Sequence, residues 1–402
     1  MNQSTIDQLL TDFSRTTEEI ISLEEFKTKL KSGKQLKIKY GVDVTAPFLH
    51  IGHAVNLWMM RKMQDMGHKV QFLIGDFTTR IGDPTGKSKT RPMIPQEEIE
   101  KNTEKFIEQV KMILRFDDPN LIEIRRNSEW YQDMNVGDFL GLLQMVTHSR
   151  LISRDMFRKR MNENEEIYMH EMIYPILQGY DSYMLQSDLT IIGSDQLFNE
   201  MMGRFYQEKF GNESQVIITT KITPGLDGVE KQSKSLNNYI GLGHSPRDKF
   251  GRIMRLPDEL IPTYLRVYTN VPLSQIEAIE KDLSNRPMEY KKFLAEEIVR
   301  MYHGDEIAKY ERKWFENTFS KKIVPDSIPV VTVEQSEIKL FELLKLLLTK
   351  QSNSEIRRLI QQGGVSIDNQ KVFDMNQKIT IEGSEHIVKV GKRRWFKVIP
   401  QK

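Results

Sequence analysis

The stretch Leu36-Lys37-Ile38-Lys39-Tyr40-Gly41-Val42-Asp43-Val44-Thr45-Ala46-Pro47-Phe48-Leu49-His50-Ile51-Gly52-His53 decides the fold. Apolar residues alternate at Leu36, Ile38 and Tyr40 and predict a short strand, and the glycine and proline that follow predict a turn. The run after it keeps one apolar face as far as residue 66 and predicts a helix. A helix start leaves backbone N–H groups free, here beside His50 and His53, where an anion can dock. The stretch is therefore a candidate phosphate site.

Length and composition limit the classes of protein to which the chain can belong. A chain of 402 residues predicts two or three domains, and a net charge of only +2 argues against a surface that binds nucleic acid everywhere. The sequence contains no cysteine, which excludes disulfides, zinc sites built on thiolates and thiol nucleophiles. The N-terminus has no basic segment followed by an apolar one, and no apolar run of about 18 residues occurs. We expect a soluble cytoplasmic protein without a membrane partner.

A second strand and a polar loop follow the first helix. Residues 69–76 are largely apolar and end near a glycine, which predicts a buried parallel strand and completes a βαβ unit. The loop over 78–91 is rich in glycine, proline, hydroxyls and cations, among them Lys87 and Arg91. Open α/β sheets bind ligands at this edge, so the loop is a candidate ligand-binding segment. A solvated surface loop is the alternative.

A polar face marks the predicted helix over 167–186. Tyr174, Gln178 and Asp181 are spaced by four and three residues, so they project from one side of a helix. Apolar residues such as Ile173, Ile176 and Leu177 lie elsewhere on the helix. Hydrogen bonding to a bound ligand explains this arrangement, and an exposed polar stripe is the alternative.

Another strand, residues 189–193, leads directly into Ser194-Asp195-Gln196 and a helix through Tyr206. An aspartate at such a turn can accept hydrogen bonds from ribose hydroxyls, or it can simply cap the helix. The pattern GxGxxG is absent, which favours a mononucleotide over a dinucleotide.

Residues 221–239 predict a flexible loop with two lysines, Lys231 and Lys234, and interleaved serines. Glycines supply mobility and the lysines supply charge, as in a lid that closes over phosphates. Lysine-rich loops are also common without such a role.

The remaining segments complete the outline. Residues 1–35, 135–160 and 246–320 predict helices, Leu121–Ile124 predicts a strand, and prolines near residue 325 predict a linker. Residues 350–402 hold eleven Lys or Arg against five Asp or Glu, a net charge of +6. Cations gather on one predicted helix and beside Trp395, which predicts a phosphate-backbone site or, alternatively, a solvated basic face. They are Arg357, Arg358, Lys392, Arg393 and Arg394.

These motifs together resemble a known family. His50-Ile51-Gly52-His53 resembles the HIGH signature of class I aminoacyl-tRNA synthetases, and Lys231-Gln232-Ser233-Lys234-Ser235 resembles their KMSKS loop. Their order and separation, with three further motifs, are similar to bacterial tyrosyl-tRNA synthetases of the KMSKS subgroup, and residues 350–372 are similar to the S4 RNA-binding module. The three motifs are Ile81-Gly82-Asp83-Pro84-Thr85-Gly86-Lys87, Tyr174-Pro175-Ile176-Leu177-Gln178-Gly179-Tyr180-Asp181 and Gly193-Ser194-Asp195-Gln196.

The resemblance implies a role for each candidate residue. Phosphate and pyrophosphate charge would be met by His50, His53, Lys231, Lys234, Lys87 and Arg91. The nucleotide pocket would be lined by Asp43, Gly52, Gly193, Asp195, Gln196 and Lys234. The tyrosine ammonium would be bound by Asp83, Tyr174 and Gln178, and Asp181 would accept the phenolic hydrogen. A carboxylate left unpaired would then reject phenylalanine.

Three positions depart from the family pattern. Lys39 stands where the better-known subgroup has a tyrosine that shares the phenol contact, so the phenol rests on Asp181 alone or with another partner. Gln232 replaces a usual methionine, and Asn237 replaces a common glycine after the lysine loop.

The resemblance also implies an architecture and partners. The fold class would be α/β, with a Rossmann-like parallel sheet in a catalytic domain (1–222), the lysine loop and a helical tRNA-binding domain (223–322), a linker (323–337) and a small α+β S4-like domain (338–402). The chain would act on L-tyrosine, ATP carrying Mg²⁺ and tRNA(Tyr), as a homodimer, without a tightly bound cofactor or a dedicated protein metal site. One alternative is a synthetase for tryptophan or another aromatic acid, against which Asp181 argues. The other is a non-catalytic RNA-binding regulator, against which the presence of both motif histidines and both motif lysines argues.

Overall fold

The computed structural model describes residues 1–84, 94–320, 328–349, 351–368, 370–381, 385–391 and 394–400. The chain forms two compact units, residues 1–308 and 309–402, and each is described by itself. Among the helices of these described ranges, none has the length and apolar character needed to cross a bilayer.

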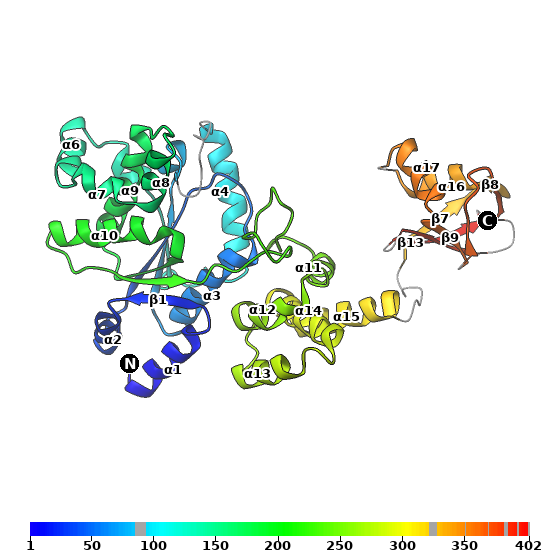
Figure 1. The fold of residues 1–402 in the computed structure, drawn as a ribbon, viewed down its shortest axis with the longest axis horizontal. Helices are drawn as coiled ribbons and strands as arrows, with labels where there is room; N and C mark the ends of the chain where they lie inside the picture. The colour runs from blue at the N-terminus through cyan, green and yellow to red at the C-terminus, as the bar shows by residue number, and fades with distance from the viewer. Residues whose placement is uncertain are drawn as a thin grey trace. The chain divides into compact units, whose positions relative to one another are not determined.

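A six-stranded sheet forms the centre of the first unit, with strand order β1-β6-β5-β2-β3-β4 (Figure 1). Five strands run parallel, and β1 joins the edge antiparallel to β6. The predicted α/β class with a Rossmann-like parallel sheet is confirmed. The strands are β1 (Thr17–Ile21), β2 (Lys37–Val42), β3 (Lys69–Ile74), β4 (Ile122–Arg126), β5 (Leu189–Gly193) and β6 (Val216–Thr220).

Helices cover both faces of this sheet. Figure 1 shows α3 (Ile51–Asp65) and α4 (Gln96–Val110) on one side, and α9 (Met169–Leu185) and α10 (Leu197–Lys209) on the other. The chain goes from β2 to β3 on one side and later returns to place β5 on the other side of β2. The strand order therefore reverses between β2 and β5, which is where open α/β sheets bind ligands.

Two segments that were predicted to be helical contain more elements than expected. Residues 1–35 form α1 (Gln3–Phe13), β1 and α2 (Leu23–Lys31), because β-branched residues of β1 pair with β6. Residues 135–160 form three short helices, since Asn135 and Thr147 cap new helix starts with their side chains. The three are α6 (Val136–Gln144), α7 (His148–Ile152) and α8 (Asp155–Asn162).

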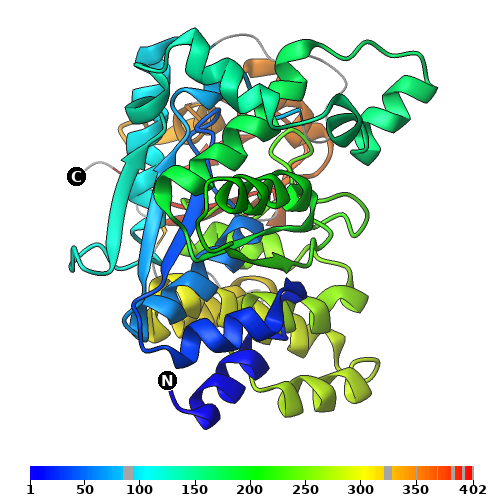
Figure 2. The same cartoon turned by 90° about the vertical axis from the view of Figure 1, so that its left-hand side faces the viewer.

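The predicted helical stretch after residue 246 is confirmed. Prolines stand at the first turn of three of its helices or just before them, where the missing N–H costs nothing. Figures 1 and 2 both show α12 (Ile261–Tyr268) and α13 (Leu273–Asp282) near α1, and Arg15 donates hydrogen bonds from its guanidinium to the carbonyls of Arg266 and Thr269, at 3.2 and 2.9 Å. The helices are α11 (Pro246–Ile253), α12 (Ile261–Tyr268), α13 (Leu273–Asp282), α14 (Pro287–His303) and α15 (Asp305–Phe315), which crosses the boundary between the units.

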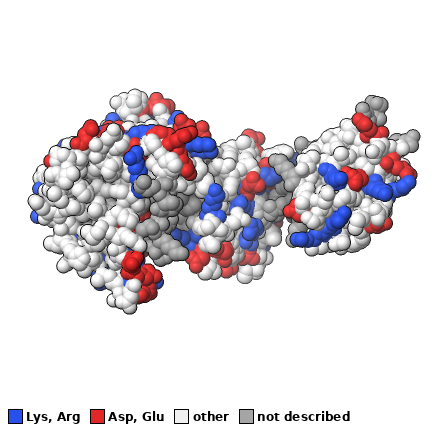
Figure 3. Space-filling view, turned by 90° about the horizontal axis from the view of Figure 1, so that it is seen from above, with Lys and Arg blue, Asp and Glu red and all other residues white. Residues whose placement is uncertain are grey.

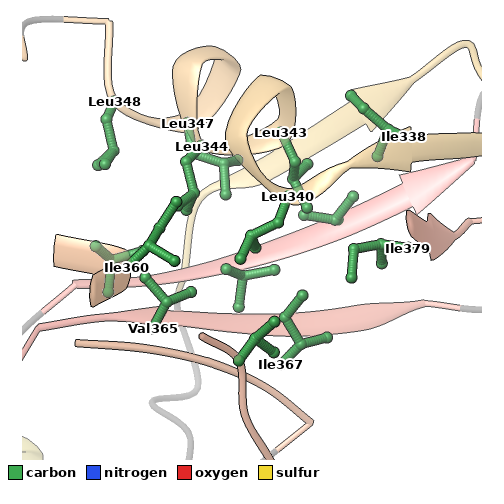
Figure 4. Packing of buried hydrophobic residues seen from close by; sticks show 14 of the residues in the cluster. Ile338, Leu340, Leu343, Leu344, Leu347, Leu348, Ile360, Val365, Ile367 and Ile379 are labelled. Atoms are coloured by element: carbon green, nitrogen blue, oxygen red, sulfur yellow. The ribbon is translucent and has the colours of Figure 1, made fainter. Parts of the chain in front are cut away.

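The second unit is a small α+β domain. Its five-stranded sheet has the order β10-β9-β12-β13-β7, and β11 pairs with β8. Leucines of α16 and Ile360 of α17 pack on the sheet to form an apolar core (Figure 4). The elements are β7 (Val330–Val333), β8 (Glu337–Lys339), α16 (Leu340–Leu347), α17 (Asn353–Gln361), β9 (Val365–Ile367), β10 (Gln370–Lys371), β11 (Lys378–Thr380), β12 (His386–Val390) and β13 (Arg394–Pro400).

One strand of this domain lies in the stretch expected to be a linker. Residues 330–333 form β7, which pairs in parallel with β13. Val333 is buried in the domain core. The C-terminal domain therefore gains a strand from residues before 338.

Candidate active site

A cavity of about 640 Å³ opens at the point where the strand order reverses. It is lined by every predicted nucleotide and tyrosine residue that the structure describes, although these come from five separate segments of the chain. They are Asp43, His50, Gly52, His53, Asp83, Tyr174, Gln178, Asp181, Gly193, Asp195, Gln196, Lys231 and Lys234. Lys87 and Arg91 lie outside the described residues.

The two histidines form the start of α3. His50 is the N-cap residue, and its Nδ1 accepts a hydrogen bond from the backbone N–H of Gly52 at 3.2 Å. His53 Nδ1 accepts from the N–H of His50 at 3.3 Å, so in both rings Nε2 carries the proton. Burial and the neighbouring His53 and Lys231 lower the pKa of His50 to about 2. Loss of hydration beside the surrounding protein and the charge of Lys231 lower the pKa of the more exposed His53 to about 4. Both imidazoles are therefore neutral N–H donors near pH 7.

The lysine loop also lines this cavity, although it lies far from the two histidines in the sequence. Lys231 Nζ lies 3.6 Å from Asp195 Oδ2, and Lys234 Nζ lies 3.6 Å from the centre of the Phe48 ring. Both lysine side chains are exposed. Their ammonium groups are thus free of deep burial and close to the histidine segment and to the acid predicted for the ribose.

Side-chain hydrogen bonds define the shape of this loop. Asn238 Oδ1 accepts from the backbone N–H of Ser233 at 2.7 Å, and its Nδ2 donates to Asp227 Oδ2 at 2.6 Å and to the carbonyl of Lys231 at 3.2 Å. Asn237 has φ +51°, a left-handed conformation that asparagine tolerates better than most residues. Asparagine therefore suits a position where glycine is common.

Gln232 ties the loop to the histidine segment. Its Nε2 donates to the Tyr268 hydroxyl at 2.9 Å, and its Oε1 accepts from the N–H of Ile240 at 3.2 Å. The carbonyl of Ile240 in turn accepts from the N–H of Ile51, at 2.9 Å, at the start of α3. Methionine, usual at this position, makes no such hydrogen bonds.

Asp181 forms the acidic end of the cavity. Its side chain is buried, and it accepts hydrogen bonds from Trp130 Nε1 at 3.0 Å and Asn127 Nδ2 at 3.4 Å. Burial raises the pKa of Asp181 to about 7, against the opposing effects of Lys39, Tyr131 and these two donors. A carboxyl group held this way is pre-oriented to accept one further hydrogen bond.

The predicted nucleotide and tyrosine residues share their walls. Tyr174 OH donates to Asp43 Oδ2 at 2.9 Å, and Gln196 Nε2 donates to Asp83 Oδ2 at 2.7 Å. Each of these bonds joins a residue predicted for ATP to one predicted for tyrosine. The two candidate subsites are therefore one connected polar surface, across which two ligands would touch.

Sequence reasoning missed three residues that support this site. Asn127 and Trp130 hold Asp181, and Glu200 accepts from Gln178 Nε2 at 2.8 Å. The only available signal for Glu200 was Lys39, a lysine in a strand whose neighbours are apolar, because a buried ammonium needs an acidic partner. The partner lies on α10, far away in the sequence.

The predicted RNA-binding residues divide into two groups. Arg357 and Arg358 are exposed on α17, and Arg394 begins β13, whereas Lys392 and Arg393 lie outside the described residues. Figure 3 shows lysine and arginine side chains exposed on the surface of the C-terminal unit beside acidic ones. Within the described parts of the chain, no group of three or more His, Asp or Glu is arranged to hold a metal ion.

Comparisons with known proteins agree with this site. The family model for class I tRNA synthetases (W and Y) matches residues 31–320, and a model for the tyrosine–tRNA ligase SYY-like C-terminal domain matches residues 320–398. The chain is 42% identical to the tyrosine–tRNA ligase of Thermotoga maritima over 96% of its own length and 95% of the relative's. It is 40% identical to the tyrosine–tRNA ligase of Aquifex aeolicus, over 95% of its own length and 96% of that protein.

Solved structures show the same fold. A mitochondrial tyrosyl-tRNA synthetase from Coccidioides posadasii matches with a TM-score of 0.61 and 23% identity, over 76% of this chain and 91% of its own. Tyrosyl-tRNA synthetase from Archaeoglobus fulgidus, solved with L-tyrosine, matches with a TM-score of 0.60 and 21% identity, over 76% and 99%. With full-length relatives near 40% identity and two family models that meet at residue 320, the chain belongs to the tyrosine–tRNA ligases of the class I aminoacyl-tRNA synthetase family.

Proposed function

We propose that the protein joins L-tyrosine to tRNA(Tyr) in two steps, through tyrosyl-adenylate. The observation that carries the proposal is the single cavity in which neutral imidazoles, two lysines and a buried carboxyl group meet. Such a set can bind a triphosphate at one end and a phenol at the other.

In the first step, a carboxylate oxygen of tyrosine attacks the α-phosphorus of ATP. The new bond is the acyl phosphate of tyrosyl-adenylate, and the bond that breaks leaves its electron pair on pyrophosphate. The protein forms no covalent intermediate, so it accelerates the step by holding the two ligands together and by meeting the charge that grows on the leaving group.

The donors that would meet this charge differ in kind. His50 and His53 would offer Nε2–H groups without charge, because their pKa values lie well below neutrality. Lys231 and Lys234 would add positive charge from a loop that is joined to the start of α3 through the hydrogen bonds of Gln232 and Ile240. Lys87 and Arg91 are proposed for the same charge. Mg²⁺ would arrive on the phosphates of ATP as part of that substrate.

The remaining residues would position the ligands. Asp195 would accept the ribose hydroxyls, with Gly193 beside it, because a Cβ on Gly193 would come within 2.9 Å of the Asp195 carboxylate. Asp43, Gly52 and Gln196 would complete the nucleotide pocket. Asp83, Tyr174 and Gln178 would bind the tyrosine ammonium, and Asp181 would accept the phenol.

In the second step, a hydroxyl of the 3′-terminal ribose of tRNA attacks the tyrosyl carbonyl, and AMP leaves. The basic C-terminal domain would bind the tRNA backbone through Arg357, Arg358, Lys392, Arg393 and Arg394. We propose the catalytic, helical, linker and S4-like divisions at 1–222, 223–322, 323–337 and 338–402, with β7 as part of the last domain. The protein would act in the cytoplasm, where translation consumes its product.

We also propose a homodimer. Large apolar side chains stand exposed between α6 and the start of α9, and exposed apolar groups of this kind mark protein interfaces. They include Val136 (74% exposed), Leu140 (50%) and Met169 (70%). Light scattering should give twice the 47.2 kDa of one chain, and Leu140→Glu should lower that mass.

The function is tested by ATP–pyrophosphate exchange. We expect exchange with tyrosine, and none with phenylalanine or tryptophan at the same concentration. Exchange with tryptophan would favour the rival synthetase, and RNA binding without any exchange would favour a non-catalytic regulator. Absence of exchange with tyrosine would overturn the proposal.

A further inference from the structure

A buried ion pair lies behind the tyrosine end of the cavity. Lys39, in the middle of β2, places its Nζ 2.8 Å from Glu200 Oε2 of α10 and donates to Ser182 Oγ of α9 at 2.7 Å. Both charged residues are 1% exposed, and both line the cavity. Two charges removed from water so completely are costly to keep, and loss of one leaves the other unpaired.

Each partner of this pair faces one of the residues proposed to bind tyrosine. Glu200 Oε1 accepts from Gln178 Nε2 at 2.8 Å, while Gln215 Nε2 donates to Glu200 Oε2 at 2.8 Å. Ser182, which accepts from Lys39, directly follows Asp181 on α9. The ion pair thus joins three elements of the fold at the point where Gln178 and Asp181 project into the cavity.

We propose that Lys39 is a positioning residue for tyrosine: through Glu200 it orients the amide of Gln178, and its ammonium stabilises the carboxylate of Asp181 that accepts the phenol. This inference deepens the proposed function and rests on it. It also gives Asp181 a supporting residue in phenol recognition: Lys39 does not contact the phenol but stabilises the charge of the carboxylate that does.

The electrostatics agree with this geometry. Burial raises the pKa of Asp181 to about 7, and the charge of Lys39 lowers that pKa. Among the described residues, the other titratable groups that face Asp181 are Tyr131 of α5 (Ser128–Tyr131) and Tyr174 of α9. Burial raises the pKa of both hydroxyls well above its usual range, so they stay neutral. Glu200 faces Lys39. Among these groups, Lys39 is the cation that favours the charged form of Asp181.

The test is the pH dependence of tyrosine use by the full-length chain. Lys39→Met keeps a long side chain and removes the ammonium, so Asp181 should hold its proton to higher pH. If its pKa rises from about 7 by one unit, the charged fraction at pH 7 falls about fivefold, since each unit is a tenfold change in the equilibrium. We expect KM for tyrosine in pyrophosphate exchange to rise by about that factor at pH 7, more than KM for ATP, and to return towards the wild-type value at pH 8.5.

The matched control is Glu200→Gln, which keeps the ammonium and removes the opposite charge. It should raise KM for tyrosine, because Gln178 loses its partner, but it should not move the pH at which KM changes to a higher value. A thermal melt shows whether Lys39→Met folds. If it does not, the double variant Lys39→Met/Glu200→Gln replaces it, because it leaves no unpaired buried charge. Its KM for tyrosine should show the same shift of the pH dependence to higher pH. A rise in KM that is equal at all pH values, or no rise, overturns the role of Lys39. No exchange by the wild-type chain would instead overturn the proposed function.

Discussion

At the scale of single residues, Asp181 combines a functional group with a cost in stability. A buried carboxylate is disfavoured in its charged form, and the surrounding donors offset only part of this, so the pKa rises to about 7. In an unfolded chain the same group has a pKa of about 3.9. Between these values the unfolded state loses its proton first, so the stability of the folded state falls as the pH rises.

We therefore expect Asp181→Asn to become more stable relative to the wild type as the pH increases from about 4 to about 7. In the middle of this window the difference in the free energy of unfolding should grow by about 1.4 kcal/mol for each pH unit. Urea unfolding at several pH values measures it. The same variant should lose tyrosine-dependent exchange, and parallel stability curves for the two proteins would contradict the buried-charge explanation.

His50 offers a second test at this scale. Asparagine also caps helices well, so His50→Asn should preserve the start of α3 while it removes the Nε2–H donor. Loss of one preorganised donor to a charge that develops in a transition state lowers kcat by about 10²–10³. Exchange kinetics should show that loss with little change in KM for tyrosine. His50→Ala removes the cap as well as the donor. If His50→Ala loses activity while His50→Asn keeps it, His50 serves the start of the helix and not the leaving group.

Residue types and order were enough to predict many of the side chains that line the cavity. His50, Asp181 and Lys231 come from motifs whose order along the chain carries that information. The supporting residues Asn127, Trp130 and Glu200 were not predictable, because each is an ordinary residue until the fold brings it beside its partner. The hydrogen bonds that connect the two subsites depend on the same tertiary placement.

At the scale of elements, α9 and α10 lie unusually close together at one glycine. A Cβ on Gly179 would come within 2.8 Å of the backbone of Met202, so alanine there must push the helices apart. We expect Gly179→Ala to lower the free energy of unfolding by about 1–3 kcal/mol. Because α9 carries Tyr174, Gln178 and Asp181, the same change should raise KM for tyrosine.

Gly141 of α6 is the matched control for this change. Nothing lies within 4 Å of a Cβ built at Gly141, and alanine favours the helix over glycine. Gly141→Ala should be neutral or should stabilise the protein by about 0.5–1 kcal/mol. Chemical denaturation of both variants checks the pair, and equal effects at the two positions would show that close packing is not the cause.

Periodicity predicted four of the five parallel strands of the first sheet, β2, β3, β4 and β5, and long helices such as α3 and α9, because their burial follows one regular pattern. It missed β6, and it missed β1 and β7, which are short edge strands whose partners, β6 and β13, lie far away in the chain. It also joined α6, α7 and α8 into one helix, because a capping residue such as Thr147 is a weak signal inside a longer apolar pattern.

At the scale of the whole molecule, the two units separate the chemistry from the basic module. Among the described residues, those that line the active-site cavity all belong to the first unit, between Lys39 and Tyr268. The exposed arginines of α17 belong to the second unit. Adenylate formation and tRNA binding should therefore respond differently to changes in the C-terminal domain.

We expect a chain that ends at residue 320 to keep tyrosine-dependent exchange and to lose most aminoacylation of tRNA. The cut lies before β7 and removes it together with its partner β13, so β7 is not left behind as an unpaired strand.

In the full-length chain, Arg357→Gln/Arg358→Gln should weaken tRNA binding about tenfold or more and reduce its salt dependence, because each lost phosphate contact lowers the slope of log affinity against log salt by about 0.7–0.9. Filter binding at several salt concentrations measures that slope. Lys345→Gln, on α16, is a control that removes one exposed cation already paired with Glu342 and should change the slope little. If the truncated chain charges tRNA at the full rate, the basic domain serves another ligand; if it also loses exchange, the first unit depends on the second for its fold.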